Sequence, residues 1–258
     1  MMALPFARPF RLPPGFTMSR CTSADVQGMT EVCNHNMDAF SNSEYTYWWG
    51  PIKAMRSWQE ERIRRRFGDA GTQQFKVVDD TNGTIVAWAK WDPPPRMVGL
   101  REEFVVYNEA GRPTSTSSLD AAGKDGDGGR DKEADDKTSR KTYAQGPPAG
   151  SNVALFQEFF YGLLSMEKKY QAHEKLVLTH LCTRPSYYSR GIGSALLGSV
   201  LDLADREGLA AYLEATRVGV SLYQKLGFKT VETLKFERTG AGNAPATLHV
   251  MVREPRAA

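Results

Sequence analysis

The residues best suited to chemistry lie in a glycine turn between a predicted strand and a predicted helix. The strand spans 175–183, the turn reads RGIGS (190–194), and the helix spans 191–208. Glycines at such a turn allow unusual backbone angles and a close approach to a ligand. The free N–H groups and the positive end of the helix dipole then favour a phosphate or pyrophosphate. Side chains that can add donors are those of Ser189, Arg190 and Ser194.

The two common phosphate-binding motifs do not fit this turn. A dinucleotide fingerprint needs glycine or alanine three residues after the second glycine, where Leu196 stands. A P-loop needs Gly-Lys followed by Ser or Thr, which the chain lacks. A Gly-x-Gly pair alone is also compatible with a tight turn that packs a helix on a strand.

The elements around this turn alternate in a way that predicts a mixed α/β layer fold. Asn82-Gly83 between two β-rich runs predicts a hairpin. Ser23 and Asp25 are expected to cap the first helix, and Ser151 or Asn152 the third. Predicted strands span 16–21, 75–80, 84–92, 175–183, 209–215, 228–237 and 246–254, and predicted helices 25–40, 52–67, 152–171, 191–208 and 217–226.

One segment, 107–150, differs from its surroundings. It holds seven Gly, three Pro, eight Ser or Thr, eight acidic and seven basic residues. Such a composition cannot bury enough apolar surface to offset its ordering entropy, so we expect a disordered insertion. It is either a tolerated surface loop or a regulatory segment. Residues 1–15 are expected to form an irregular tail, and 16–258 a single domain interrupted by this insertion.

Composition excludes several classes of protein. The net charge of +3 gives no basis for nucleic-acid binding, and no run of apolar residues is long enough for a membrane span. Three cysteines without paired spacing and four scattered histidines predict no disulfide scaffold and no metal site. We therefore expect a cytoplasmic protein, monomeric or homodimeric.

Two motifs in register resemble the GNAT superfamily (GCN5-related N-acetyltransferases). The family's acyl-CoA motif, Q/R-x-x-G-x-G/A after a strand, reads here Tyr188-Ser189-Arg190-Gly191-Ile192-Gly193. The second motif is LEA (213–215) followed by LYQKLGF (222–228). The resemblance covers the chain apart from its first ~15 residues and the insertion. The amino-acid sequence around the two motifs looks most like uncharacterised small-molecule members from filamentous fungi.

The resemblance implies a mostly antiparallel sheet flanked by helices and splayed at the acyl-CoA-binding strand. It implies acetyl-CoA as co-substrate, direct attack by an amine, and Tyr223 as the acid that protonates the leaving thiolate. The alternative for Tyr223 is packing under the Gly-Phe turn. Residues implied to contact acetyl-CoA are Leu181, Thr183, Tyr188, Ser189, Arg190, Gly191, Ile192, Gly193 and Ser194.

Two positions depart from the family pattern. Tyr188 stands where the family has Gln or Arg. Because the backbone amides supply most of the anion site, this predicts weakened rather than lost CoA affinity. Thr216 replaces a common asparagine, which puts a polar contact to the pantetheine arm in doubt.

The general base remains open among His180, Glu214 and a water chain. Side chains alternate along a strand, so we expect His180 on one face with Leu178 and Cys182, opposite the face of the family's usual base positions, Val177 and Thr179. Side chains two apart on a strand are about 6–7 Å apart, too far for a Cys-His nucleophile pair. Cys182 is then a buried apolar side chain.

The acceptor pocket is expected in the aromatic loop at 41–51, from Tyr47, Trp48 and Trp49, with Tyr45 nearby. Trp48 and Trp49 are equally well explained as core anchors for the helix that follows. The arginines at 62–66 either attract an anion or form a solvated helix face. The function predicted is acetylation of a small-molecule primary amine. Alternatives are a non-catalytic acyl-CoA-binding scaffold and a protein acetyltransferase for histone tails or N-termini.

Overall fold

The computed structural model describes residues 4–6, 11–39, 52–101, 104–108, 110–114, 146–236 and 246–256. The helices are α1 Val26–Ala39, α3 Ile52–Arg66, α5 Val153–Lys169, α6 Ile192–Arg206 and α7 Val220–Lys225. The strands are β1 Phe16–Arg20, β2 Gln73–Asp79, β3 Thr84–Asp92, β4 Leu176–Thr183, β5 Ala211–Thr216, β6 Lys229–Phe236 and β7 Ala246–Arg253.

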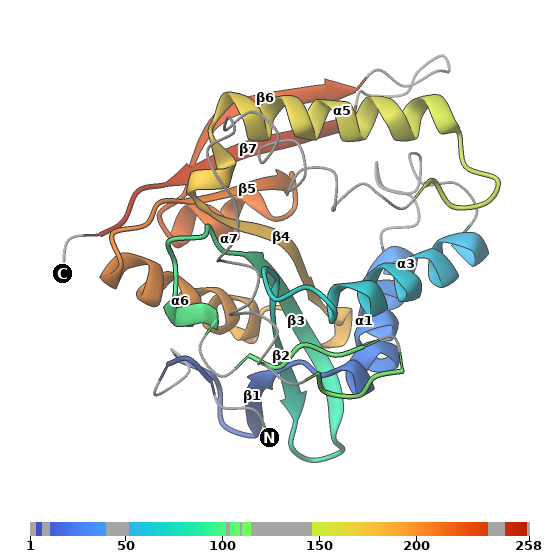
Figure 1. Ribbon diagram of the computed structural model, residues 1–258, viewed down its shortest axis with the longest axis vertical. Coiled ribbons are helices and arrows are strands. Elements are labelled where there is room, and N and C mark those ends of the chain that lie inside the picture. The colour runs from blue at the N-terminus through green and yellow to red at the C-terminus, as the bar shows by residue number, and fades with distance from the viewer. Residues whose placement is uncertain are drawn as a thin grey trace, which may run out of the picture.

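The seven strands of the described residues form one sheet in the order β1-β2-β3-β4-β5-β7-β6 (Figure 1). Neighbouring strands in this sheet run antiparallel except β4 and β5, which are parallel. The connection between β4 and β5 contains α6, as a parallel pair requires. The predicted mixed α/β fold with a mostly antiparallel sheet is confirmed.

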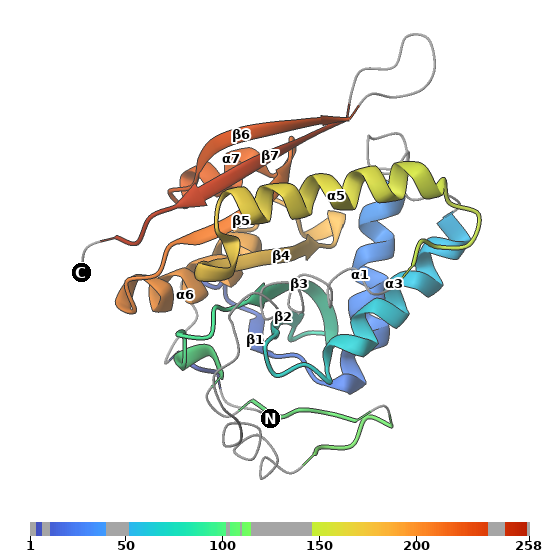
Figure 2. The same ribbon diagram turned by 45° about the horizontal axis from the view of Figure 1, so that its top comes forward.

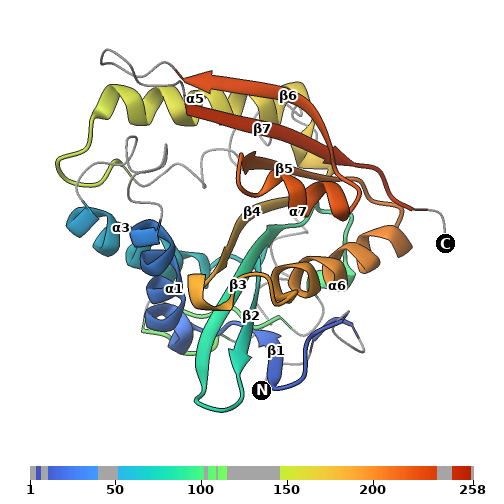
Figure 3. The same ribbon diagram turned by 180° about the vertical axis from the view of Figure 1, so that it is seen from behind.

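Helices cover both faces of the sheet and make three layers. α1, α3 and α5 lie on one face (Figure 2), and α6 and α7 lie on the other (Figure 3). α6 buries Leu196, Leu197 and Val200 in one core with β2, β3, β4 and β5. α5 buries Phe156, Phe159 and Phe160 against α3, β6 and β7. Each fully buried apolar side chain of this size contributes about 1.5–3 kcal/mol, so burial holds the layers together.

Local sequence signals explain the ends of several elements. The Asn152 side chain accepts a hydrogen bond of 3.2 Å from the Leu155 N–H, so Asn152 is the cap of α5. The first helical segment is capped one residue earlier than predicted, because Thr22 shares a reciprocal bond with Asp25. The Asn-Gly hairpin between β2 and β3 is confirmed, and Gly83 takes a positive φ of 70° there.

A β-bulge at Thr179 changes which way the end of β4 faces. Lys90 of β3 pairs with His180, and Trp91 pairs with Leu178, so Thr179 is an extra residue. A bulge interrupts the strict alternation of side chains. Leu178 and Leu181 therefore both face the α6 core, whereas Cys182 packs in the cluster beneath α1. The prediction that His180 shares a face with Leu178 is wrong for this reason.

The central part of the predicted insertion, 115–145, lies outside the described residues. At its start, the Tyr107 N–H donates to the Phe67 carbonyl at 3.0 Å, and the two rings meet edge to face. At its end, the Trp58 indole donates to the Gly146 carbonyl at 2.7 Å. Both ends of the segment are thus bound to the domain at α3 and the residues after it.

Within the described ranges, none of the helices has the length and apolar character needed to cross a bilayer.

Candidate active site

The site begins where β4 and β5 separate. Their pairing covers Leu176 with Ala211 through Leu178 with Leu213 and ends there. β4 continues to Thr183 paired with β3 on its other edge, and β5 continues to Thr216 paired with β7 (Figure 1). The end of β4 therefore has no strand partner on the β5 side among the described residues. An extended ligand with amide groups can add there as a strand does.

The glycine turn lies directly after this open strand. Ser189 and Gly191 have positive φ values of 62° and 81°, and Gly191 is the N-cap of α6. No side chain caps this helix, so its first N–H groups are not satisfied in that way. Ser189 is a non-glycine residue in a conformation that costs about 1 kcal/mol or more. A turn of this kind in front of a fifteen-residue helix suits an anionic phosphate.

The open strand, the glycine turn and α7 meet at Gly193. A Cβ placed on Gly193 would lie 3.6 Å from Leu222 Cδ2 of α7 and 3.9 Å from Thr183 Oγ1 of β4. Tyr223 follows Leu222 and is buried in the α6 core, where its ring lies 6.0 Å from that of Phe228. The tyrosine singled out in the sequence is therefore on the helix that adjoins the glycine turn.

Tyr223 is held in place by a close backbone approach. A Cβ on Gly219 would lie 2.8 Å from Tyr223 Cε2, which real side chains essentially never tolerate. Glycine at 219, just before α7, thus lets the ring lie against the start of its own helix.

Glu214 is the first residue of β5 beyond its pairing with β4. It shares a face of β5 with Tyr212, which packs against α5, opposite the face of Tyr223. Burial raises the pKa of Glu214 to about 8, and the charge of Glu167 adds to the rise. The Tyr212 hydroxyl donates to Glu214 Oε1 at 2.5 Å and lowers the pKa in part. A carboxyl with this pKa exchanges its proton near neutral pH.

His180 faces α1 and contacts two thiols. Its Nε2 lies 2.8 Å from Cys182 Sγ and 3.3 Å from Cys33 Sγ, and its ring stacks on Trp88 at 4.2 Å. The expectation that Cys182 and His180 lie too far apart to interact is wrong, because both side chains lean toward each other and toward α1. Cys182 is also only partly buried.

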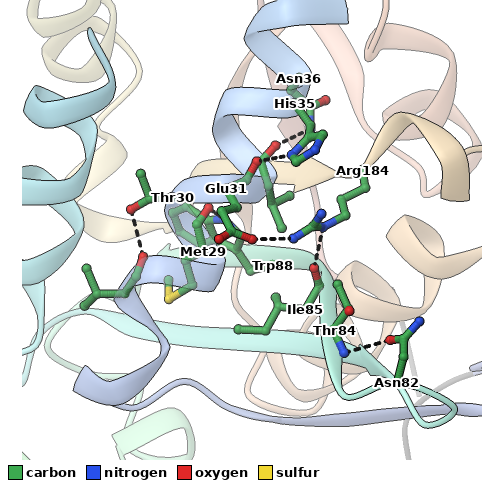
Figure 4. Close-up of polar contacts among 12 residues, drawn as sticks. Met29, Thr30, Glu31, His35, Asn36, Asn82, Thr84, Ile85, Trp88 and Arg184 are labelled. Carbon is green, nitrogen blue, oxygen red and sulfur yellow. Dashed lines mark hydrogen bonds and ion pairs between the residues drawn. The ribbon is translucent and has the colours of Figure 1, made fainter. Parts of the chain in front are cut away.

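The loop before the glycine turn is bound to α1. The Tyr188 hydroxyl donates to Asn36 Oδ1 at 2.6 Å, and Asn36 Nδ2 donates to the Thr183 carbonyl at 2.7 Å. Arg184 Nε donates to the Ile85 carbonyl, and its guanidinium pairs with Glu31 of α1 at 3.0 Å (Figure 4). The Tyr188 side chain is thus engaged with α1, and Asn36 is a contact that sequence reasoning missed.

The other expected contacts of the cofactor lie around the same turn. Leu181 packs against the α6 core. The Arg190 guanidinium lies 4.7 Å from the Tyr187 ring and donates to the Ser186 carbonyl at 3.1 Å. Ile192 is buried at the first turn of α6, and Ser194 is partly exposed.

The predicted arginine cluster divides into two groups. Arg64 and Arg65 are exposed and pair with Glu60 and Glu61 one turn earlier. Arg62 and Arg66 instead line a small cavity of about 20 Å³ between α3 and the sheet. Its other lining residues are Gln59, Ile63, Gln74, Trp88, Lys90, Thr179 and His180. The face of β4 that carries His180 therefore adjoins a basic cavity.

Tyr45, Tyr47, Trp48 and Trp49 lie outside the described residues, so the predicted acceptor loop stays a prediction. Cys33 and Asn36 were not singled out in the sequence. Both contact β4 residues 147 or more positions away. No local spacing could have indicated them.

Comparison with known proteins identifies this arrangement. The sequence model of the acetyltransferase (GNAT) domain matches residues 153–230, which hold α5, the glycine turn and α7. An uncharacterized N-acetyltransferase of Schizosaccharomyces pombe is 29% identical over 76 residues, 30% of this chain and 32% of that protein. The match thus spans about a third of that relative.

Solved structures share the whole fold. A structure from Corynebacterium glutamicum, described as histone acetyltransferase HPA2 and related acetyltransferase, covers 95% of this chain and 98% of its own, with 21% identity and a TM-score of 0.50. Mosquito arylalkylamine N-acetyltransferase like 5b covers 93% and 99%, with 11% identity and a TM-score of 0.52. At these identities the likeness concerns the fold alone.

The three layers of the described residues and the diverging strands β4 and β5 are therefore the fold of these acetyltransferase structures. Within the chain, residues 153–230 are the part that resembles a GNAT acetyltransferase domain in sequence.

Proposed function

We propose that this protein transfers an acetyl group from acetyl-CoA to the primary amine of a small molecule, with Glu214 as general base and Tyr223 as general acid. The observation that carries the proposal is the end of β4–β5 pairing at Leu178 and Leu213. Beyond that point, the end of β4 at Thr183 and Leu222 of α7, the neighbour of Tyr223 in sequence, both lie near Gly193 at the N-terminus of α6.

Acetyl-CoA suits the groups at this opening. The backbone of β4 from Leu181 to Thr183 would pair with the pantetheine amides, and the turn at 189–194 would hold the pyrophosphate. Tyr188 adds nothing to this anion site because its hydroxyl is bound to Asn36. We therefore expect the backbone and Arg190 to supply the affinity.

The two proposed catalytic residues lie on opposite faces of the opening. A primary amine has a pKa of about 10 and must lose a proton before it can attack. Glu214, with a pKa of about 8, takes that proton as the amine nitrogen bonds to the thioester carbonyl carbon. The carbon–sulfur bond then breaks, and the Tyr223 hydroxyl gives its proton to the leaving thiolate.

The basic cavity supports a small acceptor over a lysine-rich protein tail. Arg62, Arg66 and Lys90 lie on the face of the sheet that carries Glu214 and His180. The two arginines repel an acceptor with several positive charges, whereas burial lowers the pKa of Lys90 to about 7, so Lys90 adds less to this repulsion. A monoamine or an amine that carries a carboxylate fits this charge better.

The test combines calorimetric titration of acetyl-CoA with thiol release across a panel of monoamines, amino acids, polyamines and lysine-rich peptides. Tyr223→Phe is compared with Tyr161→Phe, a change at an exposed tyrosine of α5. We expect Tyr223→Phe to bind acetyl-CoA within about 3-fold of wild type and to lose about 100-fold in kcat. The control should match wild type.

Four other outcomes would each contradict a different part of the proposed function. Undiminished kcat in Tyr223→Phe would exclude this tyrosine as the acid. Binding without thiol release for every amine would favour the non-catalytic scaffold. Release with peptides alone would favour a protein acetyltransferase, and no acetyl-CoA binding would refute the proposed function.

A further inference from the structure

Three side chains of types that often bind metals lie together between α1 and β4, although they are distant in the sequence. Cys33 comes from α1, and His180 and Cys182 come from β4. Cys33 Sγ lies 3.3 Å from His180 Nε2 and 3.7 Å from Cys182 Sγ, and the latter lies 2.8 Å from His180 Nε2. We propose that these three residues bind one Zn²⁺ ion.

The spacing of the three donor atoms is close to that of a tetrahedral site. Zinc lies about 2.3 Å from thiolate sulfur and about 2.0–2.1 Å from imidazole nitrogen. Tetrahedral angles then place two sulfurs about 3.8 Å apart and a sulfur and a nitrogen about 3.6 Å apart. Two of the three separations are already close to these values. The third, Cys182 to His180, must open by somewhat less than about 1 Å, which side-chain rotation supplies.

The charge balance also favours the ion. Two thiolates neutralise Zn²⁺, so the bound cluster leaves no net charge beside Arg62. Zinc binds cysteine as the thiolate, so binding would release the protons that these thiols hold.

Neighbouring residues hold the His180 ring in place and leave the proposed site accessible to an ion from solvent. Trp88 stacks on the His180 ring, and its own indole N–H donates to the Met29 carbonyl of α1 at 3.1 Å (Figure 4). His180 and Cys182 are partly exposed, whereas Cys33 is buried. Three protein ligands leave a fourth position for water, on the side where His180 lines the small cavity.

The ion would crosslink α1 to β4 beside the Asn36 contact with Thr183. Its binding free energy would then add to the stability of the folded chain. Zinc binding is also independent of acetyl transfer, so a failure here would leave the proposed function untouched.

The experiment uses the full chain, stripped with a chelator and kept reduced with a phosphine. Zn²⁺ is titrated by calorimetry, and Co²⁺ is titrated by absorption as a spectroscopic substitute. We expect one equivalent bound, a thiolate-to-cobalt charge-transfer band, and a Tm increase on the order of 5 °C in excess Zn²⁺. Cys33→Ser and Cys182→Ser should each lose the charge-transfer band or at least halve it. Cys21→Ser, which removes a buried thiol outside the cluster, should retain it.

A wild-type chain with three titratable thiols and no charge-transfer band would overturn the proposal. So would an unchanged band in the Cys33→Ser, Cys182→Ser double variant. If the serine variants do not fold, the wild-type chain still tests the proposed zinc site. Zinc should then protect Cys33 and Cys182, and not Cys21, from alkylation mapped by mass spectrometry. Equal protection of all three thiols, or of none, would contradict the site.

Discussion

The two faces of the sheet at β4 and β5 carry different kinds of side chain. The face covered by α6 holds apolar residues such as Leu178, Leu181 and Leu213. The face toward α1 and α5 holds His180, Cys182 and Glu214. Partly buried titratable groups cost free energy unless they are paired, so we propose that this face, called here the chemical face, is the one that carries out the reaction. The α6 face provides packing and carries Tyr223.

Glu214→Gln tests the chemical face. We expect kcat/KM to fall about 100-fold or more, and the rise of kcat/KM through about pH 8 to disappear. Glu158→Gln, at an exposed position of α5, is the matched control and should keep both. A variant that keeps both the rate and its rise with pH would exclude Glu214 as the base.

Glu214→Gln should lower activity but raise the stability of the folded chain at high pH relative to wild type. The unfolded chain loses the Glu214 proton near pH 4.5, whereas the folded chain keeps it until about pH 8. The wild-type protein therefore loses stability from this group as pH rises between these values, and the loss persists above them. Glutamine does not titrate and can still accept the Tyr212 hydrogen bond. Its Tm relative to wild type should be higher at pH 9 than at pH 5.

Gly219→Ala tests the other face with a smaller effect. The new Cβ would lie 2.8 Å from the Tyr223 ring, so the ring must move. We expect kcat to fall about 10-fold while the Kd for acetyl-CoA changes little, because a misplaced acid slows only the chemical step. Gly146→Ala, where a Cβ meets nothing within 4 Å, should leave both unchanged. A matching loss of acetyl-CoA affinity in Gly219→Ala would show that the glycine supports the binding site instead.

Local patterns predicted much of the fold and the acyl-CoA motif. Strand and helix periodicity, the Asn82-Gly83 turn and the cap at Asn152 depend on neighbouring residues. The glycine turn was recognised for the same reason, because its residues are contiguous with the strand and helix that present it. Predictions failed where one inserted residue mattered, as at Thr179, which reversed the face expected for His180 relative to Leu178.

Neighbouring residues were enough to predict the order of elements and the glycine turn, and the likeness of LYQKLGF (222–228) to a GNAT motif indicated the candidate acid. The contacts of Cys33 with His180 and Cys182, and the inward direction of Arg62 and Arg66 beside Lys90, appear only in the folded chain. The packing of β5 also withdraws the Glu214 carboxyl from water beside Glu167, and both effects raise its pKa. These properties arise from packing between segments far apart in the chain, and residue spacing within one segment does not predict such contacts.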